Sequence, residues 1–409
     1  MGIYLDHAAT TPMAPEVLAA MTPYLTQDAF ANPNSLHSSG VRAKQGLIEA
    51  QKTVAECLNT TPETLIWTSG GTESNNLALF GVAETLATAF QRECAAETPG
   101  TLITSPTEHS AVLAPAKVLS QQYGWALHYV KLDSEGLINL DHLAQLLANA
   151  PENAPILVSL MHGNNEAGTL QPLAAIGELC RRYRAKFHTD AVQTLGKLPL
   201  DLSTLQIDYL SGSGHKLYGP KGIGLLWVHP EAPKPSPLLF GGDQQGGLRP
   251  GTINVAGCVG FAQALTLYRQ TMQAETNRLQ SLQQYLLDAL SNAFGAGFNL
   301  NMHTEQAQTP AIWLNGPADV RARIPGNIHL SYSKPLAAEA LLLRLDLAGF
   351  YVSSGSACHS GRIEPSHVIR AMFPDNLARA AQTVRITMGR STTAADLDAF
   401  VQAFKQILD

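Results

Sequence analysis

The stretch Ser211-Gly-Ser-Gly-His-Lys216 is the most informative part of this chain. It follows Ile207-Asp-Tyr-Leu210, a largely apolar run that is typical of a buried strand. A lysine among serine, glycine and histidine at a strand end makes little sense as packing. It suits an amine that forms a Schiff base with an aldehyde cofactor, beside hydroxyl and imidazole groups that hold a phosphate. An ordinary surface loop is the alternative.

A second motif, Asp190-Ala-Val-Gln193, lies upstream and also follows an apolar run. A buried carboxylate at a strand end suits a protonated pyridine nitrogen, which is the partner that pyridoxal phosphate requires. Together the two motifs favour pyridoxal phosphate over an incidental loop lysine.

Short apolar runs alternate with amphipathic stretches from about residue 63 to residue 228, which predicts βαβ units and a mainly parallel sheet covered on both faces. The predicted strands include residues 65–67, 101–104, 156–160, 187–189, 207–210 and 224–228. The predicted helices include residues 15–25, 40–58, 75–92, 110–123, 140–148 and 172–184. Ligands of such sheets bind outside the carboxyl ends of the strands, where most of the motifs fall.

The rest of the chain reads as a smaller α+β unit. A Pro-rich connection at residues 229–237 and a Gly-rich loop at residues 241–252 precede a long helical pattern at residues 255–294. We expect a large domain over residues 15–262, and a small domain made of residues 1–14 and 263–409.

Composition excludes several classes of protein. Of the 409 residues, 45% are hydrophobic and 15% charged, and the net charge is −6, so disorder and direct nucleic-acid binding are not expected. No signal peptide and no membrane span are visible. Five scattered cysteines suggest free thiols in a reducing cytoplasm.

Three further motifs each allow a functional and a structural interpretation. Thr68-Ser-Gly-Gly-Thr72 precedes a helix and suits a phosphate, or is a helix cap. His109, in Thr107-Glu-His109, is suited to stacking on a planar ring and moving protons; the alternative is a structural role in the loop. The asparagines of Met161-His-Gly-Asn-Asn-Glu-Ala-Gly168 bind a ligand, or form a turn.

The second half of the chain adds a thiol and a guanidinium. Cys358 lies in Tyr351-Val-Ser-Ser-Gly-Ser-Ala-Cys358-His-Ser-Gly361, a Ser- and Gly-rich loop that suits a nucleophile better than a core residue. Arg385, in a strand-like run, clamps a carboxylate or forms a half-buried ion pair.

The chain resembles the cysteine desulfurases, pyridoxal-phosphate enzymes of the class V aminotransferase group, over nearly its whole length. The resemblance implies transferase fold type I, with a mainly parallel seven-stranded sheet and a smaller α+β domain. The motifs that carry it are Tyr4-Leu-Asp-His-Ala-Ala-Thr-Thr-Pro12, Asn32-Pro-Asn-Ser35, residues 68–76, Thr107-Glu-His109, residues 162–168, Asp190-Ala-Val-Gln193, residues 211–224, Arg249-Pro-Gly-Thr252 and Ser353-Ser-Gly-Ser-Ala-Cys358.

The resemblance also implies residue roles. Lys216 holds the cofactor and moves the substrate Cα proton, Asp190 pairs with the pyridine nitrogen, and His109 stacks on the ring. Gln193 and Asn165 meet the ring oxygen, and Asn165 with Arg385 meets the substrate carboxylate. Gly71, Thr72, Ser213 and His215 bind the phosphate, and Thr252 reaches the phosphate of the other subunit of a homodimer. Cys358 attacks the sulfur of L-cysteine and becomes a persulfide, and L-alanine is released.

The implied sulfur acceptors are iron–sulfur scaffold or tRNA-thiolation proteins, and no metal ligands are predicted. Alternatives are a selenocysteine lyase, a cysteine or cystine C–S lyase, an aminotransferase, or an idle paralogue with a binding role. The chain departs from the usual pattern at His359, at Asp243-Gln-Gln-Gly246, at Pro250 and in a longer stretch over residues 303–328. These departures bear on the acceptor and on loop behaviour.

Overall fold

A computed structural model describes residues 2–26, 29–93, 100–300, 312–355, 358–359 and 362–409. Cys94 lies outside these ranges. So do residues 303–311, which are the first part of the stretch over residues 303–328 that is longer than the usual family pattern. Within them, the larger sheet has seven strands in the order β2-β8-β7-β6-β5-β3-β4. The strands are β2 (Leu65–Thr68), β3 (Thr101–Thr104), β4 (Ala126–Tyr129), β5 (Ile156–Ser159), β6 (Lys186–Asp190), β7 (Tyr209–Ser213) and β8 (Gly224–Val228).

This sheet is mainly parallel, as predicted. The ladders β3–β4, β3–β5, β5–β6 and β6–β7 are parallel, whereas β8 runs antiparallel to both β2 and β7. The carboxyl ends of the central strands therefore lie along one edge.

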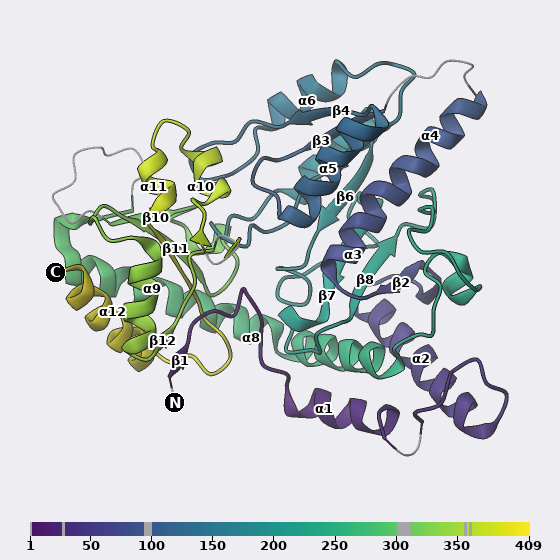
Figure 1. Ribbon diagram of the computed structural model, residues 1–409, viewed down its shortest axis with the longest axis horizontal. Helices are drawn as coiled ribbons and strands as arrows, with labels where there is room; N and C mark the ends of the chain where they lie inside the picture. The colour runs from purple at the N-terminus through teal and green to yellow at the C-terminus, as the bar shows by residue number, and fades with distance from the viewer. Residues whose placement is uncertain (1, 27–28, 94–99, 301–311, 356–357, 360–361) are drawn as a thin grey trace.

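Helices cover both faces of the sheet (Figure 1). They are α1 (Pro15–Met21), α2 (Ser38–Cys57), α3 (Gly71–Asn76), α4 (Val82–Glu93), α5 (Ser110–Tyr123), α6 (Leu140–Ala148) and α7 (Leu173–Arg182), with a π-helical turn (Leu77–Gly81) between α3 and α4. Alternate strand residues enter different cores: Ile103 and Val158 pack with α2 and α7, and Leu102 and Leu157 pack with α4 and α5. This period of two explains why the strands are apolar throughout.

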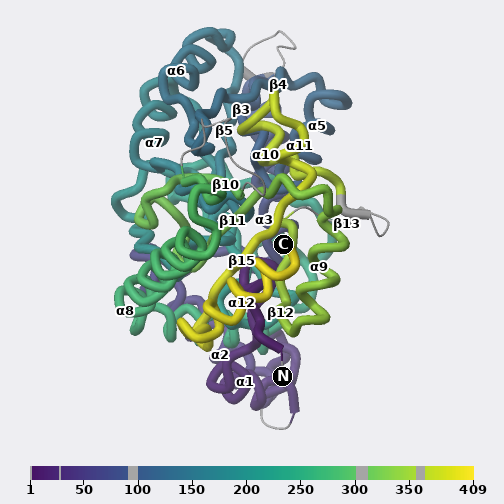
Figure 2. The backbone as a smooth tube through the Cα atoms, turned by 90° about the vertical axis from the view of Figure 1, so that its left-hand side faces the viewer, coloured from purple at the N-terminus to yellow at the C-terminus, as the bar shows by residue number. Residues whose placement is uncertain are grey.

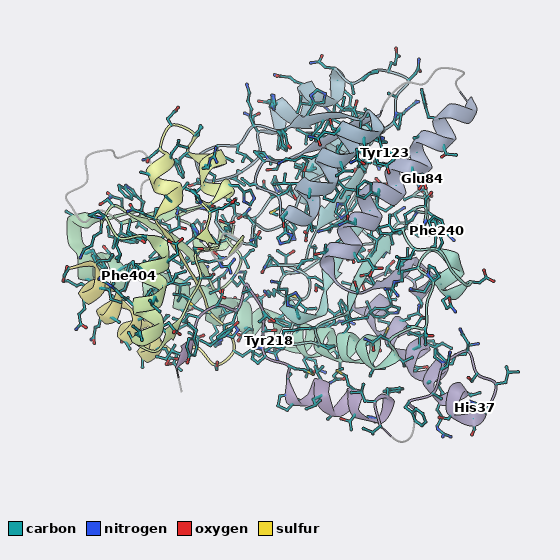
Figure 3. All side chains as sticks on the ribbon, viewed as in Figure 1. His37, Glu84, Tyr123, Tyr218, Phe240 and Phe404 are labelled. Atoms are coloured by element: carbon teal, nitrogen blue, oxygen red, sulfur yellow. The ribbon has the colours of Figure 1, made fainter. Side chains whose placement is uncertain are left out.

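A second sheet has the order β15-β11-β10-β9 within the described part of the chain. Its strands are β9 (Phe298–Asn299), β10 (Ile312–Asn315), β11 (Asn327–Tyr332) and β15 (Thr383–Thr387), and nearby are α9 (Ala338–Leu347), β12 (Phe350–Tyr351), β13 (Cys358–His359), β14 (Arg362–Ile363), α10 (His367–Met372), α11 (Leu377–Ala381) and α12 (Ala394–Leu408). Helices α9 and α12 lie beside this sheet (Figure 2). A separate apolar core joins them to it and includes Phe404 (Figure 3).

Two segments join the sheets. Helix α8 (Val255–Phe294) contributes Phe261 to the first core and Leu286 to the second. The N-terminal arm begins with β1 (Ile3–Tyr4), which pairs in parallel with β12. The boundaries predicted at residues 14/15 and 262/263 stay a prediction. No helix of the described residues has the length and apolar character to span a membrane.

Candidate active site

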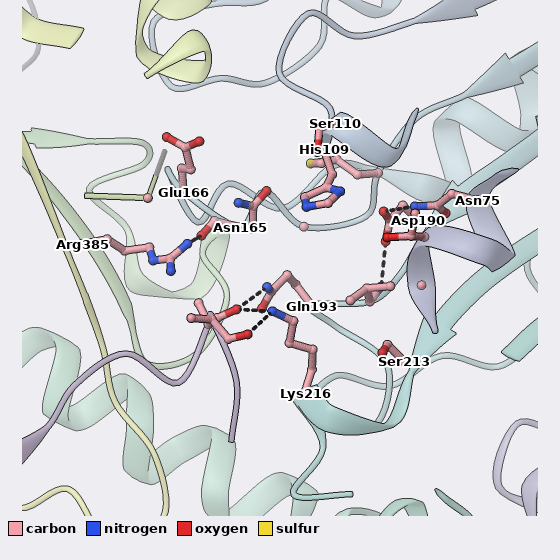
Figure 4. Close-up of a pocket in the computed structure, with 18 of the residues that line it drawn as sticks. Asn75, His109, Ser110, Asn165, Glu166, Asp190, Gln193, Ser213, Lys216 and Arg385 are labelled. Atoms are coloured by element: carbon pink, nitrogen blue, oxygen red, sulfur yellow. Dashed lines mark hydrogen bonds between the residues drawn. The ribbon is translucent and has the colours of Figure 1, made fainter. Parts of the chain in front are cut away.

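Most of the predicted site residues meet at the carboxyl ends of β5, β6 and β7, around a cavity of about 500 Å³ (Figure 4). Its lining includes Lys216, Asp190, Gln193, His109, Asn165, Arg385, Thr72, Gly71, Ser213 and His215. These residues come from segments that are far apart in the chain, so the sheet edge is what assembles them.

The Lys216 amine lies at the end of the 3₁₀ turn η4 (Gly214–Lys216), directly after β7. Its Nζ donates to the carbonyl oxygens of Ala8 (2.5 Å) and Ala9 (2.7 Å). Burial, with the nearby charges of Arg385 and Lys197, lowers the pKa of Lys216 to about 7. A large fraction of this amine is therefore neutral and nucleophilic near pH 7.

The Asp190 carboxylate closes β6 and is buried. One oxygen accepts from Asn75 Nδ2 at 2.7 Å and the other accepts the Val192 N–H at 2.9 Å. These bonds fix an anionic acceptor at the cavity wall, beside Asn75 and away from Arg385 (Figure 4). The sequence interpretation did not include Asn75.

Gln193 and His109 line the cavity and also make structural contacts. Gln193 Nε2 donates to Ala8 O at 2.9 Å. His109 caps α5, because its Nδ1 accepts the Ala111 N–H at 3.1 Å. The neutral ring therefore carries its hydrogen on Nε2, and burial lowers the pKa of His109. The two interpretations of this histidine are compatible.

The two adjacent asparagines, for which the sequence allowed either a turn or a ligand contact, lie in different surroundings. Asn164 is a buried turn residue whose Oδ1 accepts the N–H groups of Glu166 and Ala167. Asn165 lines the cavity, and its backbone oxygen accepts from Arg385 Nη1 at 2.9 Å.

The Arg385 guanidinium also lines the cavity. Its side chain is 5% exposed, and Nη2 donates to Asp6 Oδ1 at 2.9 Å. Among the residues that the structure describes, its Nε has no hydrogen-bond partner. A buried cation with an open donor is suited to an anionic ligand group.

A second hollow, of about 440 Å³, shares Ala9, Gly71, Thr72, Ser213 and His215 with the first. It lies where α3 begins, with Lys221 also in its wall. A Cβ on Gly71 would lie 2.6 Å from Val192 Cγ2, so only glycine allows this close approach. Backbone N–H groups, hydroxyls and a cation make this hollow suitable for phosphate. The amine, the carboxylate and this cradle fit pyridoxal phosphate.

Of the predicted residues whose side chains the structure describes, Thr252 is the one that lines neither hollow. Cys358 belongs to β13, which pairs with β14, and its side chain lies outside what the structure describes. Gly355 and Glu364, on either side of it in the chain, do line the cavity. Thr252 is exposed and lies apart from both hollows.

Comparison with known proteins gives the same picture. The Aminotransferase class-V family model matches residues 3–400. Cysteine desulfurase IscS of Dictyoglomus turgidum is 38% identical over 408 residues, covering 100% of this chain and 94% of that protein. Putative cysteine desulfurase IscS 1 of Bacillus subtilis is 40% identical over 392 residues, covering 96% of this chain and 94% of that protein.

A solved structure described as a NifS-like protein superposes with a TM-score of 0.84 at 31% identity, covering 100% of this chain and 99% of that one. The chain belongs to the class-V aminotransferase family, whose members of this kind are pyridoxal-phosphate enzymes of fold type I. Within that family it is a member of the cysteine desulfurases.

Proposed function

We propose that this protein converts L-cysteine to L-alanine and holds the released sulfur as a persulfide on Cys358. The observation that carries the proposal is one cavity that joins a lysine of lowered pKa, a fixed carboxylate and a buried guanidinium, with Gly355 and Glu364 from the Cys358 segment in its wall. A persulfide requires a second thiol at such a wall, whereas a simple aminotransferase does not.

Pyridoxal phosphate, when bound, supplies an electron sink for the substrate. Lys216 would attach it, Asp190 would hold the pyridine nitrogen, and His109 would stack on the ring. Gln193 and Asn165 would face the ring oxygen. Gly71, Thr72, Ser213 and His215 would hold the phosphate.

Substrate binding and proton transfer would be carried out by side chains of this protein. Arg385, with Asn165, would hold the substrate carboxylate in place of its present contacts with Asp6 and the Asn165 backbone. Lys216, with its lowered pKa, would move the Cα proton.

Further proposals concern assembly and sulfur delivery. We propose a homodimer in which Thr252, exposed on its Gly-rich loop, completes the phosphate site of the other subunit. We propose a cytoplasmic enzyme that passes its sulfur to an iron–sulfur scaffold or tRNA-thiolation protein, because the full-length relatives are named cysteine desulfurases.

The test is alanine release from L-cysteine with a reductant present, comparing wild type with Cys358→Ser. Loss of alanine in the variant supports persulfide chemistry. Undiminished alanine would mean that sulfur leaves without Cys358, which would make the protein a C–S lyase. The same assay with L-selenocysteine separates a selenocysteine lyase.

A further inference from the structure

Two ionisable side chains that the proposed roles leave unused lie within 4 Å of each other in the cavity wall. These are Glu166 and His367, and both line the cavity. Glu166 lies on the Arg385 side, away from Asp190 and Asn75 (Figure 4). The proposed function places the amine of the substrate near Lys216 and its carboxylate at Arg385. The remaining group on the substrate Cα, the CH₂–SH group, would then face this wall.

His367 is held in a defined orientation at the start of α10. Its Nε2 lies 2.9 Å from the backbone oxygen of Glu108. A carbonyl oxygen only accepts, so Nε2 carries the hydrogen and the neutral ring has its lone pair on Nδ1. The side chain is 45% exposed, and it lines the cavity.

Glu166 faces that lone pair. Its Oε1 lies 3.9 Å from His367 Nδ1, and its side chain is 2% exposed. The other oxygen, Oε2, accepts from Ser366 Oγ at 2.5 Å. Burial raises the pKa of Glu166, and the charges of His367 and Arg385 oppose that rise. Because these influences oppose each other, the Glu166 carboxyl can stabilise an imidazolium on His367 when one forms, without a strong permanent ion pair.

We propose that His367, supported by Glu166, is a further catalytic residue that carries the substrate's sulfur-bound hydrogen to Cβ. This inference rests on the proposed function. His109 also lines the cavity, but its Nδ1 is occupied as the cap of α5. His367 has the basic nitrogen that faces Glu166.

The step balances with no further reactant. The Cys358 thiolate forms a bond to the substrate sulfur, and the sulfur–Cβ bond breaks with its electron pair on carbon. The sulfur-bound hydrogen passes to Nδ1 of His367 and from there to Cβ, which becomes the methyl group of alanine. The persulfide is left as an anion on Cys358. Sulfur loses one hydrogen and the adjacent carbon gains one, so a single base serves both atoms.

The experiment compares holoenzyme variants in a single turnover. His367→Gln keeps an N–H that can reach the Glu108 oxygen but has no basic nitrogen. We expect the affinity for L-cysteine, measured from the cofactor absorbance change, to stay within about twofold. We expect the rate of persulfide formation on Cys358, measured by mass spectrometry, to fall about 100-fold or more. Glu166→Gln is expected to lower the same rate about tenfold.

His367→Ala with added imidazole distinguishes base catalysis from packing. The half-exposed position should admit imidazole, and the persulfide rate should recover in proportion to the imidazole concentration. His128→Gln, on the exposed strand β4, is the matched control and should behave as wild type. The proposal is overturned if His367→Gln forms persulfide within threefold of wild type, or if imidazole restores nothing in His367→Ala. A wild-type enzyme that makes no alanine would instead reject the proposed function.

Discussion

Burial controls the chemistry of single residues in this site. Lys216 is deprived of water and lies near the positive charges of Arg385 and Lys197, so it releases its proton at a pH where an exposed lysine keeps it. The sequence indicated Lys216, Asp190 and Arg385 by residue type and strand position. It did not indicate Asn75, Glu166 or His367, because their importance depends on partners 115 to 259 positions away that only the folded chain brings together.

The pKa of Lys216 predicts how cofactor uptake depends on pH. Below about pH 7 the amine is protonated and unreactive, and above it the amine is neutral. The rate of pyridoxal-phosphate attachment to the apo-protein should therefore rise about tenfold per pH unit up to about 7 and then level off. Stopped-flow absorbance measures this, with Lys216→Ala as the unreactive control. A rate that still rises tenfold between pH 8 and pH 9 would contradict the lowered pKa.

Asn75 should contribute to cofactor affinity through Asp190. Asn75→Ala removes the buried 2.7 Å bond to the carboxylate, and a bond to a charged group contributes about 1.5–3 kcal/mol. We expect cofactor binding to weaken by about 10- to 100-fold, measured by equilibrium dialysis. Asn149→Ala, at the exposed end of α6, is the control. Equal affinities for the two variants would show that Asp190 needs no support from Asn75.

At the scale of elements, hydrophobic periodicity predicted most of the helices and strands near their observed positions. The singled-out runs omitted β4, because this strand lies at the sheet edge with mostly exposed residues and shows no apolar run. The antiparallel direction of β8 was also not predicted, since a strand's direction leaves no trace in its own side-chain pattern.

The other edge of the sheet is covered by one side chain of the Gly-rich loop. The 3₁₀ turn η5 (Gln244–Gly247) places Gln245 against β2, where its Oε1 accepts the Trp67 N–H at 2.6 Å and its Nε2 donates to the Trp67 oxygen at 2.9 Å. The Arg249–Glu73 ion pair, at 2.8 Å, holds the same loop to α3. The loop that carries Thr252 is therefore tied to the start of the phosphate cradle.

Gln245→Ala tests this attachment. Glutamine and alanine adopt the left-handed backbone of this position (φ 52°) at similar cost, so the comparison isolates the side-chain hydrogen bonds: the two with Trp67 and a longer one, at 3.3 Å, to the Arg249 oxygen. We expect a loss of about 1–3 kcal/mol in the free energy of unfolding, measured with urea. Gln273→Ala, on the exposed face of α8, should change it by less than about 0.5 kcal/mol. Equal values for the two variants would mean that the loop is held without Gln245.

For the whole molecule, the proposed dimer makes a prediction about Phe240. This side chain is 89% exposed, and it directly precedes the Gly-rich loop that should reach the partner subunit. A second copy covering it would remove a large apolar surface from water. Sedimentation should give about twice the chain mass of 43.8 kDa for wild type, and Phe240→Asp should shift the population towards single chains. Tyr123→Asp, 64% exposed at the end of α5, is the control. A single-chain mass for wild type would reject the dimer.

The N-terminal arm has a consequence for synthesis on the ribosome. Ile3 pairs with Phe350, Leu5 and Asp6 contact Thr387 and Arg385, and the carbonyls of Ala8 and Ala9 hold Lys216. Residues 3–9 therefore take their final positions only after residues 350–387, which are synthesised much later, have been made. A nascent chain that stalls before residue 350 lacks the strand that receives the arm, so the cofactor site cannot be complete until β12 and β15 have been synthesised.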